Sequence, residues 1–109
     1  MKKFQARQGD VFIQEVDEIP QGLKPKERVN GDIILAYGEV TNHAHRIKDK
    51  KIRWFEGRNE TETYLDNSDG NVAMLTHEEH SKVELPSGKK YIAIRQREYD
   101  ELGERMVAD

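Results

Sequence analysis

The stretch Lys90-Tyr91-Ile92-Ala93-Ile94-Arg95-Gln96-Arg97 is the clearest strand signal in the chain and decides its fold class. It is short, rich in β-branched and aromatic side chains, and preceded by the turn signal Pro86-Ser87-Gly88. Runs of this kind between turn residues are typical of β-strands. Seven further short runs share the pattern, at residues 10–16, 32–37, 43–48, 52–55, 62–65, 72–75 and 83–85.

Turn residues separate these runs at close intervals. Asn30-Gly31 is a tight-turn dipeptide, and Asp66-Asn67-Ser68-Asp69-Gly70 is a longer turn signal. Turns spaced about every eight to twelve residues are typical of small barrels and sandwiches. The sequence therefore predicts an all-β fold, a small compact β-barrel or sandwich of about seven or eight short strands. We expect residues 1–109 to form a single β domain.

Composition excludes several classes of function. With a net charge of −3, the chain lacks the basic character of proteins that coat long nucleic acid, although a small nucleotide needs only a local basic cluster. The chain has no cysteine, which excludes disulfides, thiolate metal sites and a cysteine nucleophile. Neither a signal peptide nor an apolar run of about 20 residues is present, so we expect a cytoplasmic protein that does not enter membranes.

All four histidines lie in two short segments. His43 and His45 belong to Gly38-Glu39-Val40-Thr41-Asn42-His43-Ala44-His45, and His77 and His80 belong to Thr76-His77-Glu78-Glu79-His80. We expect the fold to bring the two segments together into one polar site.

The His-x-His spacing suits two kinds of chemistry. On a strand, His43 and His45 share one face and can act on the same ligand. Neutral imidazoles bind zinc, iron, nickel and copper. Two imidazoles can also cleave a phosphodiester without metal, one as general base and the other as general acid. The simpler alternative is a pair of surface histidines on a hairpin.

His77-Glu78-Glu79-His80 is not the helical zinc-protease motif, because its histidines are three residues apart instead of four. If the preceding strand continued through the segment, His77 and Glu79 would face one way and Glu78 and His80 the other. At most two of the four side chains would then point into a site. A solvated charged turn is the alternative interpretation.

The end of the last strand offers cations for a phosphate. Arg95 and Arg97 share a face if the strand continues, and a guanidinium matches phosphate geometry. A charged edge strand explains the same pattern. We predict that a substrate contacts a set of polar side chains near the histidines: Thr41, Asn42, Arg46, Glu79, Arg95, Arg97 and Tyr99.

Nearly the whole chain resembles a group of small bacterial and phage proteins. The resemblance rests on residues 38–45, on residues 77–80, on Pro86-Ser87-Gly88 and on residues 95–99, and the group often has Gly at the position of Asn42. Compact β proteins of this kind are also associated with ring nucleases, which degrade the cyclic oligoadenylate messengers of type III CRISPR defence. This resemblance implies a metal-independent phosphodiesterase, dimeric, with histidine at its centre.

A second resemblance is to cupins, in which Gly38 followed by His43-x-His45 is similar to the start of the metal-binding motif. The usual glutamate after that motif is missing, and Pro86-Ser87-Gly88 follows His80 instead of preceding a histidine. A cupin-like site would therefore need a rearranged ligand set from His43, His45, His77 or His80, and Glu79. The lack of carboxylates beside His43 and His45 in the sequence speaks mildly against a metal.

Three hypotheses follow. The first is a homodimeric phosphodiesterase without cofactor or bound metal, which cleaves cyclic oligoadenylate or a related small nucleotide with catalytic histidines 43, 45, 77 and 80. One histidine would act as general base, another as general acid, and Arg95 or Arg97 would stabilise the phosphate charge. The second is a β-barrel that binds a divalent metal such as zinc. The third is a nucleotide-binding anti-defence module without catalysis.

Overall fold

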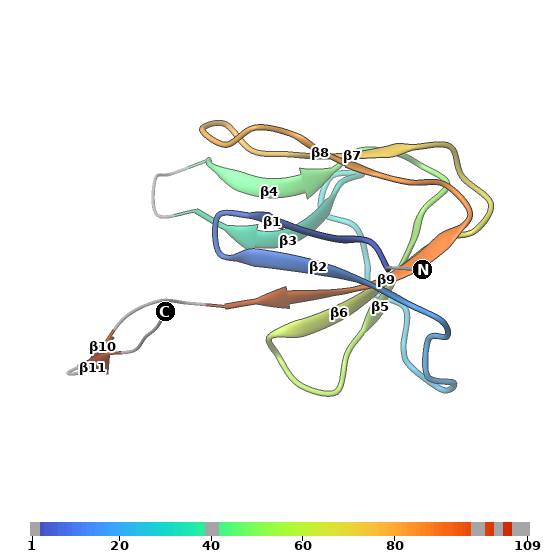
Figure 1. Ribbon diagram of the computed structural model, residues 1–109, viewed down its shortest axis with the longest axis horizontal. Coiled ribbons are helices and arrows are strands. Elements are labelled where there is room, and N and C mark those ends of the chain that lie inside the picture. The colour runs from blue at the N-terminus through green and yellow to red at the C-terminus, as the bar shows by residue number, and fades with distance from the viewer. Residues whose placement is uncertain (1–2, 39–41, 97–99, 102–103, 106–109) are drawn as a thin grey trace.

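The strands form two antiparallel sheets that face each other as a sandwich (Figure 1). The computed structural model describes residues 3–38, 42–96, 100–101 and 104–105. The five-stranded sheet has the order β1 (Gln5–Gln8), β2 (Val11–Val16), β9 (Lys89–Arg95), β6 (Glu62–Asn67) and β5 (Arg53–Glu56). The four-stranded sheet has the order β3 (Ile33–Tyr37), β4 (Ala44–Ile47), β7 (Ala73–Thr76) and β8 (Val83–Leu85). A separate pair joins β10 (Asp100–Glu101) to β11 (Glu104–Arg105).

This architecture confirms the predicted all-β class, in the form of a sandwich without a closed barrel. The two main sheets contain nine strands, one more than the sequence predicts. The additional strand is β1, whose residues Gln-Ala-Arg-Gln carry no apolar alternation. Its inward position at Gln8 holds a buried amide in place of an apolar side chain. A pattern based on hydrophobicity therefore cannot detect it.

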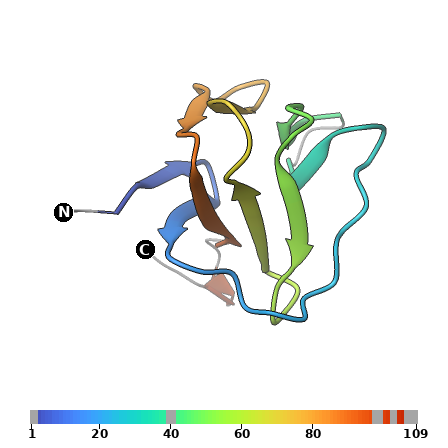
Figure 2. The same ribbon diagram turned by 90° about the vertical axis from the view of Figure 1, so that its right-hand side faces the viewer.

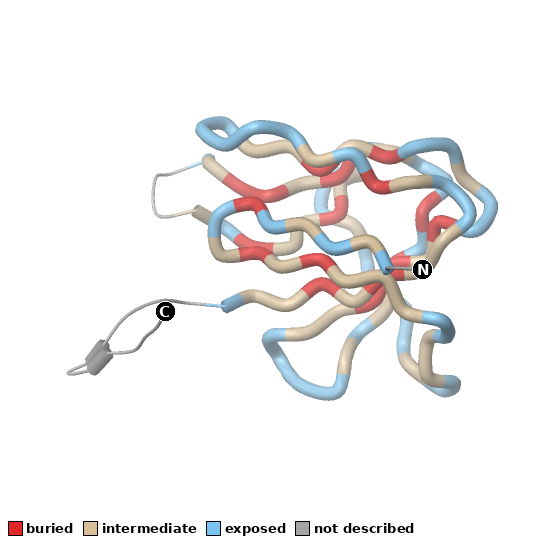
Figure 3. The backbone as a smooth tube through the Cα atoms, viewed as in Figure 1, coloured by how far each residue is buried: buried red, intermediate tan, exposed pale blue. Residues whose placement is uncertain are grey.

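The core lies between the two sheets, where alternate residues of each strand point inward (Figure 3). Ile13 of β2 and Tyr91 of β9 are fully buried from one side, and Ile47 of β4 and Leu75 of β7 from the other. Trp54 packs in the same cluster. One continuous apolar core thus holds both sheets.

The long connection from β2 to β3 passes around the outside of β5 (Figure 2). Pro25 forms a bridge with Phe55, and the N–H of Lys26 donates to the carbonyl of Trp54 at 2.9 Å. The two prolines at positions 20 and 25 keep the remainder of this connection irregular. It therefore touches the edge of β5 at this one bridge and then leads into β3.

Several chain reversals meet at one end of the sandwich. Figure 1 shows that the β1–β2 turn, the end of β3, the start of β4 and the β7–β8 connection all lie at the same end. Both histidine segments are part of these reversals. Among the residues that the structure describes, no helix has the length and apolarity to span a bilayer.

Candidate functional site

The four histidines form one cluster at this end of the sandwich. The ring centroids of His77 and His45 are 4.4 Å apart, and those of His77 and His80 are 4.6 Å apart. His43 lies 5.8 Å from His77, and His80 lies 5.7 Å from His45. The structure therefore brings the two segments together, as the sequence analysis expects.

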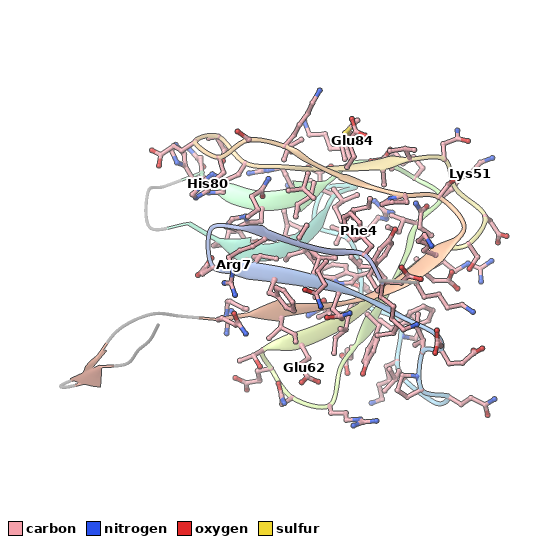
Figure 4. The ribbon with its side chains drawn as sticks, viewed as in Figure 1. Phe4, Arg7, Lys51, Glu62, His80 and Glu84 are labelled. Atoms are coloured by element: carbon pink, nitrogen blue, oxygen red, sulfur yellow. The ribbon has the colours of Figure 1, made fainter. Side chains whose placement is uncertain are left out.

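Both histidines of the second segment join the cluster because the chain turns. Strand β7 ends at Thr76, and residues 77–80 lie outside any strand. Figure 4 shows His80 beside the start of β4. The condition under which His77 and His80 would point in opposite directions, a strand continuing through residues 77–80, is therefore not met. Alternation of faces applies only while the backbone stays extended.

His45 is the buried member of the cluster and has a defined tautomer. Its side chain is inward-facing on β4, and the residue is 2% exposed. Its Nδ1 lies 2.7 Å from Oε1 of Gln8. The amide nitrogen of Gln8 donates to the carbonyls of Leu75 and Ser81 at 3.0 Å and 2.9 Å, so Oε1 must be the acceptor for His45. Nδ1 of His45 thus carries the proton, and Nε2 of the neutral ring has a free lone pair.

This lone pair faces a carboxylate. Nε2 of His45 is 3.4 Å from Oδ1 of Asp10, in the β1–β2 turn. Burial, and then the neighbouring His77, lower the pKa of His45 from its ordinary value of 6.5 to about 4, against the opposing effect of Asp10. Near neutral pH no proton stands between the two atoms. A bound cation would satisfy both of them.

Carboxylates also lie beside the other histidines. Nδ1 of His43 is 3.6 Å from Oε2 of Glu79. Glu78 accepts a hydrogen bond from the N–H of Ala44 at 2.9 Å, which is the main cause of the lowered pKa of its carboxyl. His43, His77 and Glu78 each offer a ligand atom, and these atoms all lie within 4.8 Å of one another. The sequence-based argument against a metal rests on a lack of carboxylates beside His43 and His45. That premise is wrong, because the fold brings Glu79 beside His43 and Asp10 beside His45.

His77 has its own hydrogen-bonding constraint. Its Nδ1 accepts a hydrogen bond from the N–H of Glu79 at 3.0 Å, so Nε2 carries the proton in the neutral ring. Metal binding through Nε2 requires that proton to move to Nδ1. Glu79 is exposed, and its N–H can then bond to water. Burial and the nearby His80 lower the pKa of His77, which favours the neutral form that binds metals.

Comparison with protein families assigns the chain to one of them. Residues 7–96 match a domain of unknown function, DUF8820, which covers most of the chain. The protein belongs to the DUF8820 family. No curated protein and no solved structure gives a significant match. The matched range contains all four histidines together with Gln8, Asp10 and Glu78.

The DUF8820 match agrees with the expected resemblance to a group of small proteins. It names no activity, so the association with ring nucleases stays a prediction. One detail of the resemblance has a structural reason. Asn42 has a φ of 73°, in the left-handed region that Gly adopts freely and Asn tolerates. Either residue can therefore make the turn that leads into His43.

The predicted substrate-binding residues fall into three groups. Glu79 and Asn42 lie at the cluster, and Arg46 pairs with Glu78 and Asp32, each at 3.6 Å. Arg95 lines a cavity beside β3. The remaining residues lie outside the described part of the chain: Thr41, Arg97 and Tyr99. Which of these contacts a substrate stays a prediction.

Sequence reasoning missed Gln8 and Asp10, and it passed over Glu78 in favour of Glu79. The polar triplet Gln8-Gly9-Asp10 directly before a strand is the only local signal for the first two. Their partners His45, Leu75 and Ser81 lie 35 or more positions away along the DUF8820 domain. That proximity arises from the packing of the two sheets, which the sequence does not display.

Two glycines let the backbone approach the imidazoles. Gly9 has a φ of 59°, and a Cβ there would lie 2.9 Å from Nε2 of His80 and 3.0 Å from Cε1 of His45. A Cβ at Gly38 would lie 3.0 Å from Cβ of His43 and 3.3 Å from Nε2 of His77. The cluster therefore packs directly against main chain on two sides.

Replacement of Gly9 by alanine is expected to displace His80 from the cluster, because His45 is held by Gln8 whereas His80 is exposed. We expect Gly9→Ala to lower the free energy of unfolding by about 2 kcal/mol, of which about 1 kcal/mol is the positive φ. Denaturant unfolding and the imidazole signals in NMR spectra measure the two effects.

Gly88→Ala is the matched control, because its φ is 78° and a Cβ there meets nothing within 4 Å. Gly88→Ala should lower the free energy of unfolding by about 1 kcal/mol, the part that comes from the positive φ, and leave the histidine signals unchanged. Equal losses of stability and unshifted imidazole signals in both variants would show that Gly9 is not packed on the histidines.

Proposed function

We propose that the protein binds a divalent transition-metal ion in the histidine cluster. The central ligands are His43, His77 and Glu78, whose candidate ligand atoms lie within 4.8 Å of one another. Ligand atoms on one tetrahedral ion at metal–nitrogen distances of about 2 Å are separated by about 3.3 Å, so small side-chain rotations close the set. His45 and His80 complete the surroundings.

The observation that carries the proposal is the convergence of the ligand atoms of His43, His77 and Glu78. The hydrogen bonding of His45 beside them supports it. A metal-binding histidine almost always donates its other ring N–H to a carbonyl, carboxylate or similar acceptor, which fixes the ring and its tautomer. Gln8 does this for His45, and its own amide is anchored on two carbonyls. The free Nε2 then lies 3.4 Å from the carboxylate of Asp10.

The ligand types indicate which ions fit. Imidazole and carboxylate suit zinc, iron, nickel and copper, and two histidines with one carboxylate leave positions open for water or a substrate. The negative charges of Asp10, Glu78 and Glu79 favour a cation at this place. An open centre of this kind can supply Lewis-acid activation of a bound water or substrate.

Metal titration tests the proposal. We expect the protein, stripped of metal with EDTA, to bind one equivalent of Zn²⁺, Co²⁺ or Ni²⁺ in isothermal titration calorimetry. The double variant His43→Ala/His77→Ala should bind the metal at least about a hundredfold more weakly. Glu78→Gln should weaken it about tenfold or more, whereas Glu84→Gln, which changes an exposed glutamate of β8, should not. Metal binding that survives the double histidine substitution would contradict the assignment.

A metal-independent phosphodiesterase is the second candidate, and the tautomer of His45 favours it too. A neutral ring whose Nε2 is free can accept a proton from an attacking hydroxyl. The surrounding carboxylates disfavour a phosphate, and Arg46 is already paired with Asp32 and Glu78. Cleavage of cyclic oligoadenylate that persists in EDTA and disappears in His45→Ala would support this candidate over the metal centre. Cleavage that requires added metal would reject it.

A further inference from the structure

A cavity of about 170 Å³ lies between β3 and the strands β6 and β9. Ala36, Tyr37 and Ala93 form part of its wall, together with the hydroxyl-bearing Thr61 and Thr63. Its volume is below the range of about 300–1,000 Å³ that drug-sized ligands occupy, so it suits a ligand of a few heavy atoms.

Two cations line this cavity, Arg95 and Lys26. Within the described part of the chain, neither has a carboxylate within 4.0 Å. The Lys26 ammonium lies over the face of the Trp54 ring, 4.9 Å from its centroid. Glu60 also lines the cavity without pairing to either cation. Within residues 3–38 and 42–96, no carboxylate therefore neutralises these two positive charges.

The hydrogen bonding of Arg95 points the same way. Its Nε is buried and has no acceptor among the described residues. A buried donor without a partner costs about 1–3 kcal/mol, and such groups in folded proteins call for a further acceptor. The backbone of Arg95 is held in place, since its N–H donates to the carbonyl of Thr61 at 2.8 Å and the residue pairs with Val11. The main chain of Arg95 is thus held at the cavity wall, while its buried Nε has no acceptor among the described residues.

We propose that this cavity binds a small anion that carries a carboxylate or phosphate group, held by Arg95 and Lys26. A guanidinium presents paired N–H donors that match either oxyanion, and an ammonium adds a point charge. Thr61 and Thr63 supply hydroxyls at the same wall. The site is separate from the histidine cluster, and the proposal does not depend on the metal.

NMR titration in EDTA tests the inference with inorganic phosphate in one series and succinate in another, at constant pH and ionic strength. We expect at least one of them to saturate with a Kd of about 1 mM or tighter. The shifted amides should be those of Thr61, Ala93 and Arg95. The anion that saturates identifies the preferred group.

Arg95→Met should weaken binding about tenfold or more, because it keeps the side-chain stem and removes the charged donors. Arg53→Met is the matched control, since Arg53 is an exposed arginine of β5 paired with Asp69. Lys26→Met should weaken anion binding as well. It is the test variant to use if Arg95→Met does not fold. Saturation by neither anion, or unchanged affinity in both Arg95→Met and Lys26→Met, would overturn the inference.

Discussion

Replacement of Gln8 by methionine is expected to destabilise the protein by about 3 kcal/mol. Gln8 is 2% exposed, and its side-chain amide satisfies the carbonyls of Leu75 and Ser81 and the ring N–H of His45. Methionine has nearly the same length but cannot hydrogen-bond effectively to any of them. Each buried group left without a partner costs about 1–3 kcal/mol, and relaxation recovers part of the sum. Chemical denaturation measured by circular dichroism gives the difference directly.

Gln5→Met is the matched control for this experiment. Gln5 lies on the same strand, but its side chain is exposed and bonds to the side chain of Gln14. Surface substitutions of this kind usually change stability by no more than about 0.5 kcal/mol. Similar unfolding midpoints for Gln8→Met and Gln5→Met would mean that Gln8 does not hold His45. The proposed tautomer of His45 would then lose its support.

The second large effect is a loss of stability in mild acid. Folded His45 has a pKa of about 4, whereas the unfolded chain takes up this proton near the ordinary pKa of 6.5. The unfolded state therefore binds more protons between these values, and stability falls as the pH drops from about 6.5 to about 4. The difference of about 2.5 pKa units corresponds to about 3 kcal/mol. The lowered pKa of His77 acts in the same direction.

Denaturant unfolding of the metal-free protein, measured in EDTA at a series of pH values, tests this expectation. Glutamine at position 45 stays uncharged, so His45→Gln should remove most of the slope between pH 4 and 6.5. The histidines and carboxylates that face His45 are His77, His80 and Asp10, and they remain in the variant. A slope that is identical in both proteins would show that His45 is not the group that titrates.

Local patterns were enough to predict most of the strands. The run from Lys90 onward is strand β9 (Lys89–Arg95), and residues 10–16 contain β2 (Val11–Val16). Both strands alternate between the core and the outer face, which is the feature that the sequence displays. Strand β1 was missed because its buried position is Gln8. Burial of this side chain is favourable only because its amide finds hydrogen-bond partners, and hydrophobicity does not reveal them.

The candidate site was predictable only in part. The histidines were visible because four of them fall in two segments, yet the geometry of residues 77–80 required knowing that β7 ends at Thr76. Asp10 and Gln8 became neighbours of His45 through the packing of the five-stranded sheet on the four-stranded sheet, which no local pattern records. The expected dimer and nucleotide remain predictions for the same reason, since both concern surfaces and partners.

The hydrogen bonds of Gln8 to Leu75 and Ser81 span 67 and 73 positions of the chain. During synthesis, three separate segments that contribute to the cluster leave the ribosome one after another: residues 8–10, 43–45 and 77–80. Contacts between such distant segments form slowly, because a large loop must close before they contribute. A nascent chain that has not passed Ser81 therefore lacks one of the two carbonyls that anchor the amide of Gln8, and its site is incomplete.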